Sequence, residues 1–310
     1  MESKKLLVTA SPHLTDGSST MGLMVHVIIA LVPAWIASVL IFGLRALAVS
    51  AVTVIACVVF EALYNILMKK PQTIGDCSAV VTGIILAFNL PASIPLWIAV
   101  VGAFVAIVVT KQLFGGLGMN FANPALVGRI ALFIGFAARM TNYTPPEGAL
   151  DGMASATPLA LAKTQSGIAM LKDLLLGTHP GMLGETCAVA LILGGIYLIA
   201  TKTISPAIPV SYLATVAVMC VLLGQDVVLH LLSGCLLLGA FFMATDYVTS
   251  PFTLKGKIVF GIGLGIITCA IRFYGNMNEG VSFAILLMNL VVPYINDLTR
   301  QKPLGGANAK

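Results

Sequence analysis

The chain has 310 residues, of which 58% are hydrophobic and only 9% are charged. Its mean hydropathy is +1.01, which excludes an ordinary water-soluble domain, because such domains carry about 25% charged residues. The net charge is +5, and no nucleic-acid-binding motif accompanies it, so anionic membrane lipid accounts for this charge better than nucleic acid does. The composition predicts one integral membrane domain.

Apolar segments of roughly the length that a bilayer requires, about 20 residues, recur along the chain. The first follows a polar segment with no cleavage-type site, so it is predicted to be a retained span and not a signal peptide. The predicted fold is an all-α polytopic membrane protein. We expect about ten spans, near Leu23–Phe42, Ala46–Met68, Ala79–Leu90, Ile94–Val109, Pro124–Ala138, Thr186–Ala200, Ala207–Leu223, Val227–Ala244, Ile258–Ile271 and Val281–Ile295.

A weak internal echo suggests two inverted five-helix repeats. Thr82-Gly83 recurs as Ser233-Gly234, and Met119-Asn120 recurs as Met277-Asn278. Five spans in each half would make the halves inverted, which is common in transport folds. The expected parts are a cytoplasmic N-terminal segment (1–20), a first repeat (21–140), an extracytoplasmic loop (141–185), a second repeat (186–296) and a cytoplasmic tail (297–310).

The positions of the basic residues predict the orientation in the cytoplasmic (inner) cell membrane. With the N-terminus inside, eleven of the 17 basic residues lie on cytoplasmic segments, five lie outside and Arg129 lies within a span. The positive-inside rule then puts both termini in the cytoplasm and the 141–185 loop outside. The inner set is Lys4, Lys5, Lys69, Lys70, Lys111, Lys202, Lys255, Lys257, Arg300, Lys302 and Lys310; the outer set is Arg45, Arg139, Lys163, Lys172 and Arg272.

The long polar loop contains the turn Asp151-Gly-Met-Ala-Ser-Ala-Thr157-Pro158-Leu159. Thr157 precedes a proline and a helix-favouring run, so it is predicted to be an N-cap with proline at the first helical position. A phosphate on the Thr157 hydroxyl would face free backbone N–H groups. The simpler interpretation is that Thr157 only caps a short helix.

Three charged residues stand in or beside predicted spans. Glu61 and Arg129 are costly inside a membrane, so a functional role or a mutual ion pair is expected for them. Asp246 stands where the eighth span breaks, and Thr249 and Ser250 after it suit an Asx-type turn, with a cation or ligand contact as the alternative.

Asn120 and Asn123 are three residues apart just before Pro124. If this stretch is helical, the two amides share a face and offer donors and acceptors to a planar heteroaromatic ring. Helix capping by Asn123 is the alternative.

The remaining chemical groups carry no predicted site. His26 and His230 are single histidines on apolar helices, and we interpret both as packing residues. The six cysteines have no Cys-x-x-Cys spacing, so neither a disulfide nor an iron–sulfur cluster is expected. No nucleotide-binding loop, metal-binding histidine pair or catalytic residue is recognised.

Several stretches, in order, resemble one family of membrane proteins. They are Ser11-Pro-His13 with Ser19-Thr20 and Val27–Ala34, the run Gly115–Arg129, the turn Ala156-Thr157-Pro-Leu, and the run Ala244–Pro251. Together they resemble RnfD of the Rnf electron-transport complex and its relative, the B subunit of the sodium-pumping NADH:quinone oxidoreductase.

This resemblance implies FMN joined through its phosphate to the Thr157 hydroxyl. A flavin transferase installs the FMN at a pattern of Asp, two residues, Ser or Thr, Gly, Ala, and Ser or Thr. Asp151, Ala156 and Thr157 fit this pattern, whereas Ala154 and Ser155 depart from it. The resemblance also implies noncovalent riboflavin beside Asn120 and Asn123.

The implied function is that of an electron carrier in an ion-translocating ferredoxin:NAD oxidoreductase. Its partners would be RnfA, RnfB, RnfC, RnfE and RnfG of the complex, with the flavoprotein RnfG delivering electrons at the outer face. The flavins would do the redox chemistry while the protein holds them and tunes their potential. A secondary transporter or channel without a redox cofactor is the alternative, since inverted repeats and broken spans suit it equally well.

Overall fold

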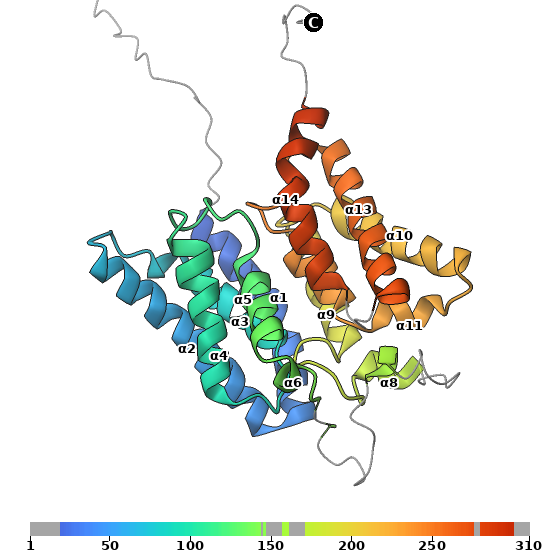
Figure 1. The fold of residues 1–310 in the computed structure, drawn as a ribbon, viewed down its shortest axis with the longest axis horizontal. Coiled ribbons are helices and arrows are strands. Elements are labelled where there is room, and N and C mark those ends of the chain that lie inside the picture. The colour runs from blue at the N-terminus through green and yellow to red at the C-terminus, as the bar shows by residue number, and fades with distance from the viewer. Residues whose placement is uncertain (1–18, 144, 147–156, 161–170, 276–279, 301–310) are drawn as a thin grey trace, which may run out of the picture.

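The protein is all-helical in the part of the chain described by the computed structural model, which is residues 19–143, 145–146, 157–160, 171–275 and 280–300. Figure 1 shows the arrangement. The first half contains α1 (Thr20–Phe42), α2 (Leu44–Leu67), the short 3₁₀ helix η1 (Ile74–Asp76), α3 (Ser78–Phe88), α4 (Leu96–Phe104), the π-helix η2 (Val105–Gln112), α5 (Pro124–Gly135) and α6 (Ala137–Met140). After these come α8 (Leu171–Leu176), α9 (Ala188–Ala200), α10 (Ala207–Leu222), α11 (Val227–Leu232), α12 (Leu236–Leu238), the π-helix η3 (Gly239–Met243), α13 (Leu254–Tyr274) and α14 (Val281–Thr299).

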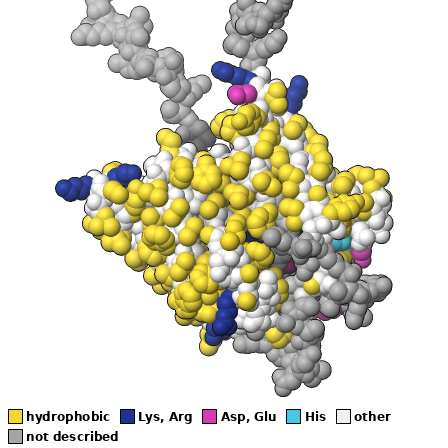
Figure 2. Space-filling model, viewed as in Figure 1, with side chains coloured by type: hydrophobic (Ala, Val, Ile, Leu, Met, Phe, Trp, Pro, Cys, Tyr) yellow, Lys and Arg dark blue, Asp and Glu magenta, His cyan; other side chains and the backbone are white. Residues whose placement is uncertain are grey.

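Within the described ranges, four helices, α1, α2, α13 and α14, are long and apolar enough to cross a bilayer. The apolar helices α3, α5, α9 and α10 are shorter, as is the continuous helix formed by α4 and η2. Apolar side chains cover most of the face shown in Figure 2, and Lys and Arg lie near its edges. Exposed apolar surface on this scale is typical of a membrane protein and not of a soluble monomer.

Two of the expected spans are broken. The eighth, Val227–Ala244, is interrupted by Ser233–Cys235 between α11 and α12, and the fifth is interrupted at Phe136. The sequence echo does not mark equivalent positions, because Thr82-Gly83 lies within α3 whereas Ser233-Gly234 lies between two helices. Its second member, 277–278, lies outside the described residues.

Side-chain caps set the start of several helices. The hydroxyl of Ser19 accepts a hydrogen bond from Gly22 N at the start of α1, and the hydroxyl of Thr253 accepts one from Gly256 N at the start of α13. Asn123 precedes Pro124 and accepts from Ala125 N at 3.1 Å, so the capping interpretation of Asn123 is confirmed. Each cap supplies a partner for a backbone N–H that the helix itself leaves unpaired.

Backbone groups at the break after α3 are paired by the loop that precedes α9. Gly184 N donates to the carbonyl of Phe88 at 2.9 Å, and Leu183 N donates to the carbonyl of Leu90 at 3.1 Å. A Cβ at position 184 would collide with the Phe88 side chain, so glycine permits this approach. The loop therefore satisfies carbonyls that have no partner in α3.

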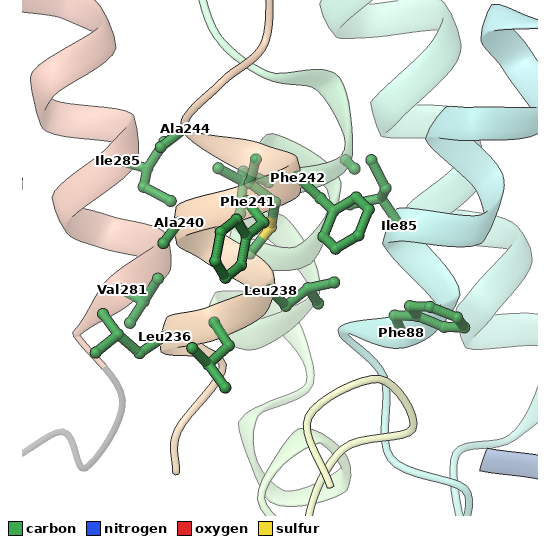
Figure 3. Close-up of a cluster of buried hydrophobic side chains, with 14 of the residues drawn as sticks. Ile85, Phe88, Leu236, Leu238, Ala240, Phe241, Phe242, Ala244, Val281 and Ile285 are labelled. Atoms are coloured by element: carbon green, nitrogen blue, oxygen red, sulfur yellow. The ribbon is translucent and has the colours of Figure 1, made fainter. Parts of the chain in front are cut away.

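The π-helix η3 joins the two halves of the molecule. Its Phe241 and Phe242 lie among buried side chains of other elements, including Ile85 and Phe88 of α3 and Ile285 of α14 (Figure 3). Helix α1 packs on α9, α2 packs on α3 and α4, and α10 packs on α13. One apolar core therefore runs through both halves.

Different loops and helix ends lie at the top and at the bottom of the molecule. In the view of Figure 1 the C-terminal end of α14 lies at the top, whereas α6 and α8 lie at the bottom. The loops before α5 and before α9 thus lie at opposite ends.

Gly194 allows α9 to approach α1, because a Cβ there would collide with the carbonyl oxygen of Ala30. We expect Gly194→Ala to lower the free energy of unfolding by about 1–3 kcal/mol through overpacking, measured by thermal unfolding in detergent. Gly135→Ala is the matched control, since nothing lies within 4 Å of its Cβ position. Equal melting temperatures for the two variants would contradict this account of the α1–α9 contact.

Candidate functional site

Thr157 begins a helical turn, as its sequence context predicts. Residues 158–160 are helical, and Ala160 N lies 2.9 Å from the carbonyl oxygen of Thr157 and 3.4 Å from its hydroxyl. The side chain is buried, with 3% of its surface exposed. The capping interpretation is confirmed, while Asp151, Ala154, Ser155 and Ala156 lie outside the described residues.

Leu159 anchors this turn to the second half of the chain. It is buried in a small cluster with Leu174 of α8 and Leu229 of α11. Its side chain also contacts the backbone at Gly234, where a Cβ would collide with Leu159. Gly234 has a φ of 76°, a conformation that glycine adopts without strain. The Thr157 turn thus rests on the break between α11 and α12.

Arg272 and Glu185 hold that break from two sides. The guanidinium of Arg272 donates to the carbonyl of His230 at 2.6 Å and to those of Ser233 and Gly234 at 3.0 Å each. The carboxylate of Glu185 accepts from Gly234 N at 2.8 Å. Arg272 is 1% exposed. The pattern of basic residues placed Arg272 only in the outer set and did not predict this role. An arginine in the last turn of a long apolar helix is the signal for it.

A cleft between the two halves brings the two predicted asparagines together with Asp246. Its walls are mostly apolar and carry a few polar side chains, as is typical of small-molecule sites. The wall residues come from α1, α3, η2, the loop before α5, α9 and the segment from η3 to Val248. Neither half of the chain encloses this cleft alone.

Asn120 and Asn123 do not share a helical face, because α5 begins only at Pro124. Both nevertheless line the cleft and are largely buried. Asn120 Nδ2 donates to the carbonyl of Ala122 at 3.0 Å, and Asn123 Nδ2 donates to that of Met243 at 3.4 Å. Asn120 Oδ1 accepts no hydrogen bond from the described residues, so it remains an acceptor at the cleft.

Asp246 forms the predicted turn. Its carboxylate accepts from Val248 N at 3.4 Å and from the hydroxyl of Thr249 at 3.2 Å. Desolvation raises the pKa of the Asp246 carboxyl above its ordinary value, although both hydrogen bonds act in the opposite direction. Ser250 is buried beside this turn.

Glu61 does not pair with Arg129, so the expected mutual ion pair is wrong. Glu61 Oε2 lies 2.8 Å from the ammonium of Lys111, and its Oε1 accepts from the hydroxyl of Thr73 at 2.5 Å. Lys111 also donates to the hydroxyl of Ser78 at 2.5 Å. Lys111 is buried in η2 and lines the cleft, although the sequence analysis assigned it to a cytoplasmic segment.

Arg129 fixes a different part of the core. It donates to Asn89 Oδ1 at 2.8 Å and to the hydroxyl of Ser282 at 2.5 Å. Its other terminal nitrogen lies 3.1 Å from the sulfur of Met182. Arg129 therefore connects the break after α3 with α14.

The two histidines interpreted as packing residues both lie against aromatic side chains. His26 Nδ1 lies 2.9 Å from the hydroxyl of Tyr197, and the ring of His230 packs edge-on against Phe273. All six cysteines are free thiols. No group of three or more His, Cys, Asp or Glu side chains within the described ranges could hold a metal ion.

Breaking the buried pair should destabilise the protein more than replacing it. We expect Lys111→Met to lower the free energy of unfolding by about 3–5 kcal/mol, because it leaves Glu61 charged and unpaired, and Glu61→Gln in the same chain to recover part of this loss. Thermal unfolding in detergent measures both, with Lys255→Met as an exposed control. If the loss of unfolding free energy in the double variant equals the sum of the two single losses, Glu61 and Lys111 do not stabilise each other.

Comparison with known proteins gives consistent matches along nearly the whole chain. The profile of the NQR2, RnfD, RnfE family matches residues 7–305. The D subunit of the Na(+)-translocating ferredoxin:NAD(+) oxidoreductase complex of Acetobacterium woodii is 47% identical, with 100% of this chain and 98% of the relative covered. The D subunit of the proton-translocating ferredoxin:NAD(+) oxidoreductase complex of Clostridium ljungdahlii is 40% identical, with 96% of each chain covered. The D subunit of an ion-translocating oxidoreductase complex of Actinobacillus succinogenes is 36% identical, with 98% and 99% covered.

Proposed function

Since the chain belongs to the NQR2, RnfD, RnfE family, we propose that it is the RnfD component of an ion-translocating ferredoxin:NAD oxidoreductase complex. The names of three relatives that match nearly end to end support this proposal. One of them is described as sodium-translocating and another as proton-translocating. The proposed role is to carry electrons through the membrane part of the complex.

The hydroxyl of Thr157 is the proposed attachment point for FMN. It stands at the start of a helical turn, where backbone N–H groups favour a phosphate. Asp151, Ser155 and Ala156 would form the sequence that the flavin transferase reads. Because the Thr157 side chain is 3% exposed, we expect the transferase to act before Leu159 docks against α8 and α11.

The cleft between the halves is the proposed riboflavin site. Asn120 Oδ1 is an available acceptor there, and Asn123 is anchored by its cap. Apolar side chains such as Phe241 and Phe242 supply walls for a flat ring. This combination of mostly apolar walls with a few placed polar groups is typical of cofactor sites.

Bound flavins would supply the electron-carrying chemistry, and the protein would supply orientation and electrostatics. The asparagines would orient a ring in the cleft, and the apolar side chains around it would pack against its faces. The Thr157 turn, held through Leu159 and the break that Arg272 fixes, would keep the phosphate anchor in place.

The proposed topology has about ten spans in two inverted halves, with both termini in the cytoplasm and Thr157 outside. The backbone at Cys77 and Cys235 supports the inverted arrangement of the two halves. Both residues have a left-handed backbone conformation, with φ of 60° and 54°, and each directly precedes a short helix, α3 and α12 respectively. The proposed partners are RnfA, RnfB, RnfC, RnfE and RnfG of the complex, with RnfG delivering electrons, together with the flavin transferase and lipid of the cytoplasmic membrane.

Replacing the acceptor tests the proposed function directly. We expect Thr157→Ala to lose all covalent flavin and Thr157→Ser to keep some, because serine keeps the nucleophilic oxygen. Mass spectrometry of the peptide and fluorescence on a denaturing gel measure the change. The alanine variant should still insert, since losing a cap costs about 1 kcal/mol.

Two outcomes would count against this assignment. Fluorescence that remains in Thr157→Ala on the denaturing gel would mean that the acceptor lies elsewhere. A protein from its native host without any flavin would favour a secondary transporter or channel.

Replacing the asparagines tests the riboflavin site separately. We expect Asn120→Leu combined with Asn123→Ser to deplete noncovalent riboflavin while covalent FMN stays, because serine preserves the cap of α5 but removes the amide. Acid extraction followed by chromatography measures the released flavin. Asn123→Ser alone is the control for the cap, and unchanged riboflavin in the double variant would disprove the site.

A further inference from the structure

Lys111 is a buried cation in the wall of the cleft. Its side chain is 2% exposed, and it lines the same space as Asn120, Asn123 and Asp246. A lysine ammonium inside an apolar helical protein is costly unless it is paired and hydrogen-bonded. Its position therefore needs an explanation.

The ammonium is only partly satisfied by its neighbours. It carries three hydrogens, and the described residues offer two acceptors, Glu61 Oε2 at 2.8 Å and the hydroxyl of Ser78 at 2.5 Å. The third hydrogen has no acceptor among these residues. One donor of Lys111 is thus free for a molecule in the cleft.

The groups behind Lys111 hold it in place. Thr73 donates to the second oxygen of Glu61, and Asn65 donates to the hydroxyl of Thr73 at 3.1 Å. Ser78 in turn donates to the carboxylate of Asp76 at 2.5 Å. These contacts fix the positions of the Glu61 and Lys111 side chains. Glu61 is fully buried and does not line the cleft, so the positive member of the pair faces this space.

Asp246 is the other charged residue among those that line the cleft. Its carboxylate is engaged by its own turn, through Val248 N and the hydroxyl of Thr249. The groups that face the cleft therefore include one cation with a free donor and one anion, each of whose oxygens accepts a hydrogen bond from its own turn.

We propose that Lys111 is the charge-compensating residue for electron transfer to the flavin in the cleft. An electron that arrives without a proton adds one negative charge to the ring system, and the donor, the covalent FMN, loses that electron. The Lys111 ammonium stabilises the added charge and raises the midpoint potential of the cleft flavin, and no bond to Lys111 forms or breaks. This inference rests on the proposed function, because it requires a flavin in the cleft.

The full-length chain carrying Thr157→Ala is the protein to test, because it lacks the proposed covalent FMN and leaves only the cleft flavin. Its midpoint potential is measured by spectroelectrochemical titration in detergent. We expect Lys111→Met to lower this potential and Lys111→Arg to leave it close to the parent. The exposed Lys255→Met is the control and should leave it unchanged.

A double variant allows the potential to be measured even if Lys111→Met alone folds poorly. Glu61→Gln with Lys111→Met removes both charges and leaves no unpaired carboxylate. Since Lys111 and not Glu61 lines the cleft, the potential should still fall. If a variant loses its flavin, riboflavin is added back. The Kd of oxidised riboflavin divided by the Kd of reduced riboflavin then reports the shift in potential, and this ratio is compared between the variant and the parent.

The outcomes separate the inference from the function on which it rests. A flavin-containing double variant with the potential of the parent, or an unchanged ratio of Kd values, overturns the role of Lys111. A parent chain that neither contains flavin nor binds added riboflavin overturns the proposed flavin site itself, and with it this inference.

Discussion

Backbone groups left unpaired by a broken helix inside an apolar protein must find hydrogen-bond partners within that protein. At the break after α3, the partners come from the loop that contains Leu183 and Gly184. At the break between α11 and α12, they come from Arg272 and Glu185. Segments distant in sequence are therefore held together where helices stop.

The buried charges follow from the same constraint. Arg272 donates to three backbone carbonyls, and Arg129 connects the break after α3 with α14 through Asn89. Lys111 lies beside Ser78, the first residue of α3, and its charge is balanced by Glu61. A single unpaired charge at this depth would cost several kcal/mol, so each of these side chains is bound to its place by polar contacts.

Both candidate sites stand where helices end. The Thr157 turn rests on the backbone at Gly234, and the cleft lies where η3 gives way to the Asp246 turn. Breaks free polar groups for a ligand, while the surrounding helices supply rigid apolar walls. The proposed flavins would thus lie where helices end and polar groups are held between apolar walls.

The sequence alone determined the membrane class, the cap at Asn123, the turn at Asp246 and the packing of His26, because each depends on composition or on neighbours a few residues away. A sequence motif and a family resemblance predict Thr157 as the acceptor. Only the tertiary structure decided that Glu61 pairs with Lys111 and not with Arg129, and that Arg272 supports the break beneath the Thr157 turn. These pairings join residues about 40 to 50 positions apart, and helix packing, which local patterns do not encode, decides which side chains face each other.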